Sequence, residues 1–599
     1  MKKTTLNYLI YGSVLLFLLI SYIISIFYLD RVEIRAGNIV PVVNLWVLFG
    51  LVTIGIITGL LLMRAAPSTF YFLSKDKIAT PQKGIYLLVA ALVLIKLGAF
   101  FLSPSHLQFM RVWPDSTGYL SDMYTVYQDP VRIFDHKSPV YTIWLLINYL
   151  LFNPILPDMG GNIYFGVKIF YSNIVPPIIL QNIIGIISAV ICFNVFSKLN
   201  RPLAYCVTLL TFFNPTAIAI ENAILRESLA LFFVLSGFAL FLKSAQQEGN
   251  IYKENIYSFL SGIVFVLAYQ TRPEIIIIYI ILCLFLLIHT LYKSRKTWKP
   301  LFLFCLPVML SILFTGFISY KSINKGYGGV FGVAIFGLKS ECYFYESQTF
   351  PDLIKNIQKR AIQCENERKS PCDDPAPSAF IFKSFIDEEI YKYIGIQLFG
   401  KEDYKYTPNE IHKRIHDKIQ DQLFLDIIKN NTFVFIKSVF TNVGYNLIHN
   451  VHNTVPIMYD GNNYWIAQNW NYYVSPQMLS LYEKDKPSYK YINYFFRIIE
   501  LHTTRKILFP FFFIGAIILI FKISGEGVSV NYTNKKLILL SILTIPVVHL
   551  LFLSIMANNV ARFVYPILPF IFAIEVIGVM GVYYRVKSLF SKQTVETKM

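Results

Sequence analysis

Charge is scarce in this sequence, and that scarcity excludes an ordinary soluble domain. Asp, Glu, Lys and Arg make up 15% of the 599 residues, whereas 55% are hydrophobic and the mean hydropathy is +0.51. Soluble domains carry about 25% charged residues. Apolar runs close to the roughly 20 residues that cross a bilayer recur along most of the chain. We therefore predict an all-α polytopic membrane protein.

Motifs of several other protein classes are absent as well. The chain has no Gly-rich phosphate loop of the P-loop type, no Gly-x-Ser-x-Gly elbow and no Cys-x-x-Cys pair. These absences leave no sequence signal for a P-loop nucleotide site, a serine hydrolase or a paired-thiol site. No repeat of about 20 to 50 residues is visible either, so a solenoid is not predicted.

Cysteine is also sparse, with seven residues in the chain. Cys342, Cys364 and Cys372 lie in the one long polar segment, where one disulfide can form if that segment faces an oxidising compartment. Because their number is odd, the pairing stays open. The other four lie in apolar runs, where a thiol is simply a small hydrophobe: Cys192, Cys206, Cys283 and Cys305.

The net charge of +18 indicates membrane orientation and not nucleic acid, because much of the Lys and Arg lies in short links between apolar runs. Basic links face the cytoplasm, so Lys2 and Lys3 place the amino terminus there. The strongest link, residues 293–299, fixes the orientation again near the middle of the chain. Both termini are expected in the cytoplasm, which agrees with an even number of spans, about twelve.

The apolar runs divide the chain into four parts. Residues 1–102 hold the amino-terminal helices, and residues 103–320 form the membrane core with an outer loop that carries short interfacial helices. Residues 321–505 are expected to form a mixed, mainly helical extracytoplasmic domain, and residues 506–599 the last helices and a cytoplasmic tail. The expected spans lie at about 8–28, 40–63, 85–102, 174–196, the run ending at 220, 229–242, 256–269, 275–291, 301–320, 507–521, 537–556 and 563–584.

Asp115 is the acidic residue of the outer loop with the most interest for function. The orientation places it outside, where a membrane enzyme meets a lipid-linked substrate at the bilayer surface. Pro114 disfavours a regular helix here, and an aspartate that caps a helix starting at Ser116 is the alternative. A carboxylate at this place can accept a proton or hold a divalent cation such as Mg2+ or Mn2+. We predict Asp115 as the catalytic base or as a metal-assisted activator, and as the metal ligand if a metal is bound.

Several arginines fall on the same outer side, at the ends of apolar helices. A charge inside hydrocarbon costs about 3 kcal/mol or more, so charges gathered at helix ends indicate a wet pocket. A guanidinium presents a planar fork that matches phosphate oxygens. We predict that Arg562 and Arg272 bind the phosphate of a donor substrate, with Arg226 as a weaker member.

Each arginine also has a structural alternative. Arg562 could extend to a lipid head group, and Arg272 could pair with Glu274. Arg226 and Glu227 are adjacent at a tight turn and could form a structural ion pair.

The polar segment offers two further patterns. Trp465 and Trp470 belong to an aromatic cluster of the kind that stacks on sugar rings or lies at a membrane interface. His412 and His416 are spaced as a helical metal pair would be, but their basic neighbours favour a solvated helix face.

A carboxylate and several arginines on one side suit transfer from a phosphorylated donor. Nucleotide sugars are scarce outside the cytoplasm, so a lipid-linked phosphate sugar is the donor that this side would meet. Five short stretches carry these residues: Pro114-Asp115-Ser116-x-x-Tyr119, His136-Lys137-Ser138-Pro139-Val140-Tyr141, the run from Asn222 through Arg226 and Glu227, Thr271-Arg272-Pro273, and Ala561-Arg562-Phe563-x-Tyr565-Pro566.

In their order these stretches resemble the GT-C superfamily of membrane glycosyltransferases, which includes protein O-mannosyltransferases and lipid A aminoarabinose transferases. That family keeps an essential acidic residue in its first large outer loop, and the resemblance assigns this role to Asp115. It also implies support from Glu227, Tyr119, His136 and Lys137. The resemblance implies a GT-C-like fold.

The resulting prediction is a bacterial inner-membrane glycosyltransferase with its active site facing the periplasm or exterior. Its expected partners are a polyprenyl-phosphate-linked sugar donor, a glycan, glycolipid or protein acceptor, and membrane lipids, with no nucleic acid. One alternative is an O-antigen polymerase or ligase that takes a diphosphate-linked oligosaccharide. Another is a lipid-linked sugar flippase or transporter, a class that usually shows broken helices at mid-membrane or paired repeats.

Overall fold

The computed structural model describes the chain in segments. They are residues 30–35, 38–43, single positions between 53 and 63, 83–101, 114–135, 138–152, 162–164, 167–169, 171–213, 215–246, 250–293, 298–321, 347–367, 388–397, most of 410–439, 514–525, 533–556 and 561–596. Several predictions lie outside these residues. They concern the span at 8–28, Cys342, Cys372, His136, Lys137, Trp465 and Trp470.

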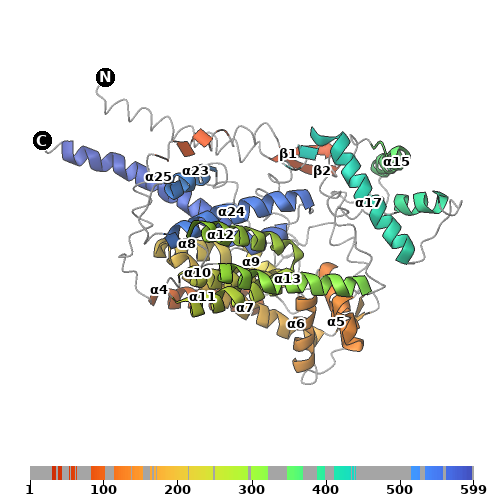
Figure 1. The fold of residues 1–599 in the computed structure, drawn as a ribbon, viewed down its shortest axis with the longest axis horizontal. Coiled ribbons are helices and arrows are strands. Elements are labelled where there is room, and N and C mark those ends of the chain that lie inside the picture. Colours follow the sequence, from red (N-terminus) through yellow and green to blue (C-terminus); the bar gives the residue numbers. More distant parts are fainter. Residues whose placement is uncertain are drawn as a thin grey trace.

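Helices dominate the described residues, as predicted, and the helices of the core lie together in one bundle (Figure 1). The elements of the first half are β1 (Asp30–Arg35), β2 (Asn38–Val43), α4 (Lys83–Phe101), α5 (Pro114–Gln128), the 3-10 helix η3 (Pro130–Asp135), α6 (Pro139–Phe152), β3 (Asn162–Tyr164), β4 (Val167–Ile169), α7 (Tyr171–Ser197), α8 (Arg201–Phe212), α9 (Pro215–Glu221), α10 (Glu227–Gln246) and α11 (Ile251–Thr271).

The second half continues the bundle and adds helices that lie apart from it. Figure 1 shows α15 and α17 at the right, away from the core. The elements are η4 (Pro273–Ile275), α12 (Ile276–Lys293), α13 (Trp298–Lys321), α15 (Pro351–Glu367), a helical segment at 388–397, α17 (Glu410–Asn430), α23 (Ile514–Gly525), α24 (Thr533–Met556), η9 (Ala561–Ile567) and α25 (Leu568–Glu596).

The hairpin of β1 and β2 corrects the predicted span at 40–63. Residues 40–43 are a strand, and β2 pairs antiparallel with β1 from Arg35 opposite Asn38 to Asp30 opposite Val43. The physical reason is the composition of β2, in which four of the six residues are β-branched Ile or Val, and these favour extended backbone. Such a run is as apolar as a membrane helix, so hydropathy alone does not separate the two.

The run that ends at 220 is also corrected, because two helices replace the single predicted span. α8 starts after Asn200, whose side-chain oxygen accepts the backbone N–H of Leu203 at 3.2 Å. α9 is a separate short helix that begins at Pro215. Proline suits a first helical position because it has no N–H to donate to the preceding turn. The break ends α9 at Glu221 and places residues 222–226 in a turn before α10.

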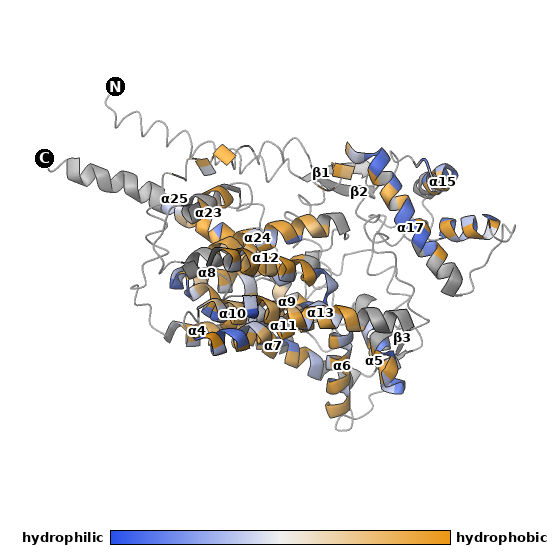
Figure 2. Cartoon of the chain, in the orientation of Figure 1, coloured by the Kyte–Doolittle hydropathy of each residue, from blue (hydrophilic) through white to orange (hydrophobic). Residues whose placement is uncertain are grey.

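Three helices of the described part are long and apolar enough to cross a membrane. They contain Pro176–Ser197 in α7, Glu227–Ala245 in α10 and Val564–Tyr583 in η9 and α25. The span predicted at 229–242 was short, and α10 extends it at both ends. Figure 2 shows that hydrophobic residues predominate along the bundle helices. These features agree with a multi-pass membrane protein, while the count of about twelve spans stays a prediction.

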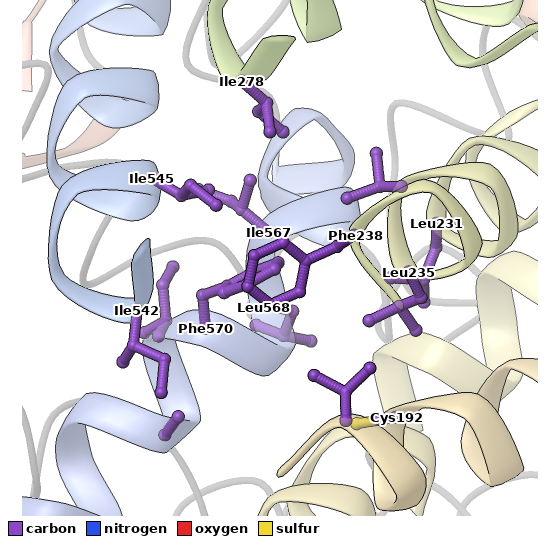
Figure 3. Packing of buried hydrophobic residues seen from close by; sticks show 14 of the residues in the cluster. Cys192, Leu231, Leu235, Phe238, Ile278, Ile542, Ile545, Ile567, Leu568 and Phe570 are labelled. Carbon is purple, nitrogen blue, oxygen red and sulfur yellow. The ribbon is translucent and has the colours of Figure 1, made fainter. Parts of the chain in front are cut away.

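The core of the bundle is formed by aromatic and aliphatic side chains from distant parts of the chain. Figure 3 shows Phe238 of α10 against Ile567, Leu568 and Phe570 near the start of α25. The rings of Phe238 and Phe570 have centroids 5.2 Å apart at an edge-to-face angle of 73°. Between helices in a membrane, such close packing stabilises the bundle through van der Waals contact. This packing fixes η9 and α25 against α10, and so places two of the predicted site segments in one unit.

A small helical unit lies between residues 347 and 430. Phe350 packs edge-to-face on Tyr393 at 5.9 Å, and Tyr391 stacks on His416 at 4.5 Å. The carboxylate of Asp426 accepts hydrogen bonds from the Ser347 hydroxyl at 2.5 Å and from the Thr349 backbone N–H at 3.0 Å. The described residues of this unit are mainly helical, and the predicted extracytoplasmic domain at 321–505 stays a prediction.

The solvated face predicted for His412 and His416 is wrong at His416. Its side chain is buried, with 5% exposed. The stack on Tyr391 explains the burial, because an imidazole covers an aromatic ring well.

Candidate functional site

Four charged side chains meet where two turns of the bundle lie against α5 and α6. Arg226 ends the turn before α10 and Glu227 is the first residue of α10, whereas Arg272 and Glu274 come from the turn between α11 and α12. Tyr119 of α5 lies over Arg226. We call Tyr119, Arg226, Glu227, Arg272 and Glu274 the charged cluster. It combines three of the five stretches that the sequence predicted to act together.

Arg272 is the centre of the charged cluster and is fully buried. It follows the last residue of α11 with extended backbone (φ −144°, ψ 110°), which the proline after it favours. Its Nη1 donates to Glu227 Oε1 at 3.0 Å, and its Nη2 forms an ion pair with Glu274. The pairing with Glu274, which the sequence offered as the structural alternative, is therefore present together with a second carboxylate.

Arg226 is half-buried and joins three segments. Its Nη1 donates to the Ser138 hydroxyl at the start of α6 and lies 3.4 Å from the Thr271 carbonyl oxygen. The guanidinium carbon lies 5.5 Å from the centre of the Tyr119 ring, which is a cation–π contact. Among the described residues, the buried Nε of Arg226 has no hydrogen-bond partner. A buried N–H without a partner costs about 1–3 kcal/mol, so this atom is a place for a ligand oxygen.

Charge and burial together set the protonation of Glu274 and Tyr119. Burial would raise the pKa of Glu274, but Arg272 and Arg226 outweigh it and lower that pKa, so the carboxylate is ionised. Burial raises the pKa of Tyr119 to about 12, and its hydroxyl stays protonated at neutral pH. The ionised carboxylate of Glu274 thus lies with two guanidinium groups among buried side chains.

Aromatic rings connect Tyr119 to α6. Tyr119 packs edge-to-face on Tyr141 at 5.2 Å, and Tyr141 stacks on Trp144 at 5.6 Å. The Tyr141 hydroxyl donates to Gln181 of α7 at 2.9 Å. These contacts hold α5, and with it the Asp115 segment, against the bundle.

Asp115 lies in the first turn of α5, and this corrects the prediction of an irregular loop. The helix starts at Pro114 instead of Ser116, so Asp115 is inside the helix and not its cap. A proline is tolerated at the first helical position, and an acidic residue in the first turn interacts favourably with the helix dipole. Asp115 precedes Tyr119 by four residues, which puts both positions on the same face of α5.

The remaining predicted residues are placed less completely. Arg562 lies in η9, three residues before Tyr565, and only its backbone is described. His136, Lys137, Trp465 and Trp470 lie outside the described residues. Their roles stay predictions.

Sequence reasoning missed a second group of buried polar side chains beside the charged cluster. Lys96 of α4 forms an ion pair with Glu221 at the end of α9, and the Tyr565 hydroxyl donates to Glu221 Oε1 at 3.0 Å. All three are almost fully buried. The available signal was a lysine inside an otherwise apolar run, because such a charge needs a partner. The sequence gives no means to identify that partner 125 residues away.

A metal site is not assembled by the described side chains. Within that part of the chain, no three His, Cys, Asp or Glu residues gather as a metal ion requires. The side chain of Asp115 is outside this set, so its role as a metal ligand stays a prediction.

The apolar bundle and its buried charged cluster at helix ends define the class as a polytopic membrane protein with a polar site at the ends of its helices. The comparison with protein families gives the second step. Residues 138–323 match the model of the Alg9-like mannosyltransferase family, and this segment contains Arg226, Glu227, Arg272 and Glu274. The match confirms the predicted resemblance to GT-C membrane glycosyltransferases and the assignment of the chain as an enzyme of that type.

Other comparisons add little. No curated protein sequence matches the chain. Two solved structures of ArnT from Cupriavidus metallidurans, in the apo state and bound to undecaprenyl phosphate, are 12% identical and cover 84% of this chain and 78% of theirs. Their TM-scores are 0.27 and 0.31, too low to support a conclusion.

Proposed function

We propose that the protein transfers a sugar from a polyprenyl-phosphate-linked donor to an extracytoplasmic glycan, glycolipid or protein, at the inner membrane of a bacterium. The observation that carries the proposal is the half-buried guanidinium of Arg226. Its buried Nε has no partner among the described residues. The guanidinium carbon lies over the ring of Tyr119, which belongs to the same helix as Asp115. A phosphate oxygen is a suitable acceptor for that N–H.

The roles follow from what each arginine contacts. Arg272 already holds two carboxylates and is fully buried, so in this proposal it positions Glu227 and Glu274 and does not bind the donor directly. Arg226, with Arg562 of η9, takes the phosphate. This changes the predicted order of the arginines, in which Arg226 was the weaker member.

Asp115 is the proposed base that accepts the proton of the acceptor hydroxyl, or the ligand of a divalent cation that activates it. Its position one helical turn before Tyr119 supports the assignment, because Tyr119 contacts Arg226. Base and phosphate ligand then lie on facing elements, as group transfer requires.

The first test uses purified enzyme in vesicles with polyprenyl-phosphate mannose as donor and cell-envelope glycolipid as acceptor. We expect Asp115→Asn to lower the turnover by about 10²–10⁴-fold, because a positioned general base contributes that much. The matched control is Asp129→Asn, which changes an exposed aspartate that pairs with Arg132 outside the cluster. Full activity of folded Asp115→Asn would remove Asp115 from the reaction.

Donor choice separates the proposal from its alternatives. The same vesicles with a diphosphate-linked oligosaccharide should show no transfer, whereas transfer from that donor alone would favour a polymerase or ligase. Movement of the lipid-linked sugar across the bilayer without transfer would favour a flippase.

A further inference from the structure

The Lys96–Glu221–Tyr565 group connects three elements that are far apart in the sequence. Lys96 belongs to α4, Glu221 ends α9, and Tyr565 lies in η9. The ion pair and the hydrogen bond to Glu221 Oε1 are buried, with exposed fractions of 2% for Lys96 and 0% for Glu221. The α9 end is therefore linked by side chains both to the amino-terminal helices and to the segment that carries Arg562.

Stability alone does not account for this buried pair. Apolar side chains of similar volume often replace a buried ion pair at no cost, or with a gain of about 1–4 kcal/mol. The bundle nevertheless leaves room for it. A Cβ added to Gly185 of α7 would lie 2.6 Å from Glu221 Cδ and 2.6 Å from Lys96 Nζ, so a larger residue there would displace the pair. The fold keeps this space for a specific contact.

The turn after Glu221 is fixed along its length. Gln181 of α7 donates to the Ala223 carbonyl oxygen at 2.7 Å, and Asn182 donates to the Asn222 side-chain oxygen at 3.3 Å. At the far end of the turn, Arg226 reaches Ser138 and Tyr119. One short turn, held by hydrogen bonds from α7, therefore separates Glu221, which contacts Tyr565 of η9, from Arg226, which is proposed to bind phosphate.

We infer that Glu221 is a positioning residue that sets η9 relative to Arg226 through the hydroxyl of Tyr565. Arg562 lies three residues before Tyr565, so the position of this hydrogen bond decides where the backbone of Arg562 stands with respect to Arg226. The inference rests on the proposed function and adds to it the device that brings the two phosphate-binding arginines together.

The experiment measures binding of undecaprenyl phosphate by thermal stabilisation of the purified protein in detergent. Tyr565→Phe removes one hydroxyl and keeps the buried ring. We expect the lipid concentration at half-maximal stabilisation to rise about tenfold, the effect of losing one hydrogen bond to a charged group. Arg562→Ala should raise it as well, and the double variant should raise it no further than Arg562→Ala alone.

The control is Ser258→Ala, which removes the buried hydrogen bond of 2.6 Å between Ser258 and Ser244, away from the site. It should lower the melting temperature without lipid and leave the half-saturating concentration unchanged. Gly185→Ala is a second, independent disturbance of Glu221 and should weaken lipid binding in the same way as Tyr565→Phe. It serves in place of Tyr565→Phe if that variant does not fold.

The outcomes separate the two ideas. If the wild-type protein binds the lipid and Arg562→Ala weakens binding, while Tyr565→Phe and Gly185→Ala behave like Ser258→Ala, Glu221 is structural only and the inference is wrong. If undecaprenyl phosphate does not stabilise the wild-type protein at all, the proposed donor is wrong, and the inference fails with it.

Discussion

At the scale of single residues, Arg272 shows how a predicted ligand can have another role. A guanidinium beside a proline at an outer helix end has the sequence pattern of a phosphate-binding residue. The structure places two carboxylates on it and removes it from solvent. Local sequence indicated the partner two residues away, Glu274, but gave no indication of Glu227, because that contact depends on how α10 and α11 pack.

Substitution of Arg272 by Ala should strongly destabilise the folded protein. Glu227 and Glu274 would lose their common partner inside the bundle, and breaking a buried pair costs about 3–5 kcal/mol. The measurement is the free energy of unfolding in mixed micelles titrated with denaturing detergent. Arg132→Ala is the control, because its pair with Asp129 is exposed and such pairs contribute about 0–1 kcal/mol. Equal stability of the two variants would show that Arg272 does not hold the two glutamates.

At the scale of elements, apolar patterns predicted helix positions better than helix boundaries. The helices at α4, α7, α11, α12 and α13 lie close to the predicted runs. The two wrong predictions have local causes. β-branched residues favour the extended backbone of β2, and Pro215 starts a new helix at α9. Hydropathy responds to neither feature, because both leave the run apolar.

The unit of α15 and α17 offers an element-scale prediction through Asp426. Hydrogen bonds from Ser347, the backbone at 348 and 349, and Asn430 lower the pKa of Asp426 in spite of partial burial, which raises it. A carboxylate with a lowered pKa in the folded state stabilises it above the ordinary value of about 3.9. That contribution is lost as the pH falls through the lowered pKa. We expect the link between α15 and α17 to loosen below about pH 4.

Limited digestion with pepsin across acidic pH measures this change as the rate of cleavage near residues 347–350. In Asp426→Asn the cleavage should already be fast at the upper end of the range and depend less on pH. Asp421→Asn, on the same helix, should keep the steep wild-type dependence. A wild-type pH profile in Asp426→Asn would show that another group controls the unit.

At the scale of the whole molecule, long-range contacts decide the site. The membrane orientation predicted from the basic links was enough to predict that residues around 115, 226, 272 and 562 lie on the same side. The structure unites the segments at 119, 226 and 272 in one cluster. It joins the segment at 562 to the neighbouring turn through Tyr565 and Glu221. The individual side-chain contacts could not be predicted from the sequence, because they depend on how helices from both ends of the chain pack together.

The balance of charge in the charged cluster has a consequence for an enzyme in an energised membrane. Arg226, Arg272, Glu227 and Glu274 carry formal charges that cancel. A transmembrane voltage acts on net charge, at about 2.3 kcal/mol per elementary charge and 100 mV. The four side chains together carry no net charge on which the voltage could exert a force. We therefore expect the arrangement of these four side chains to be the same in polarised and depolarised vesicles.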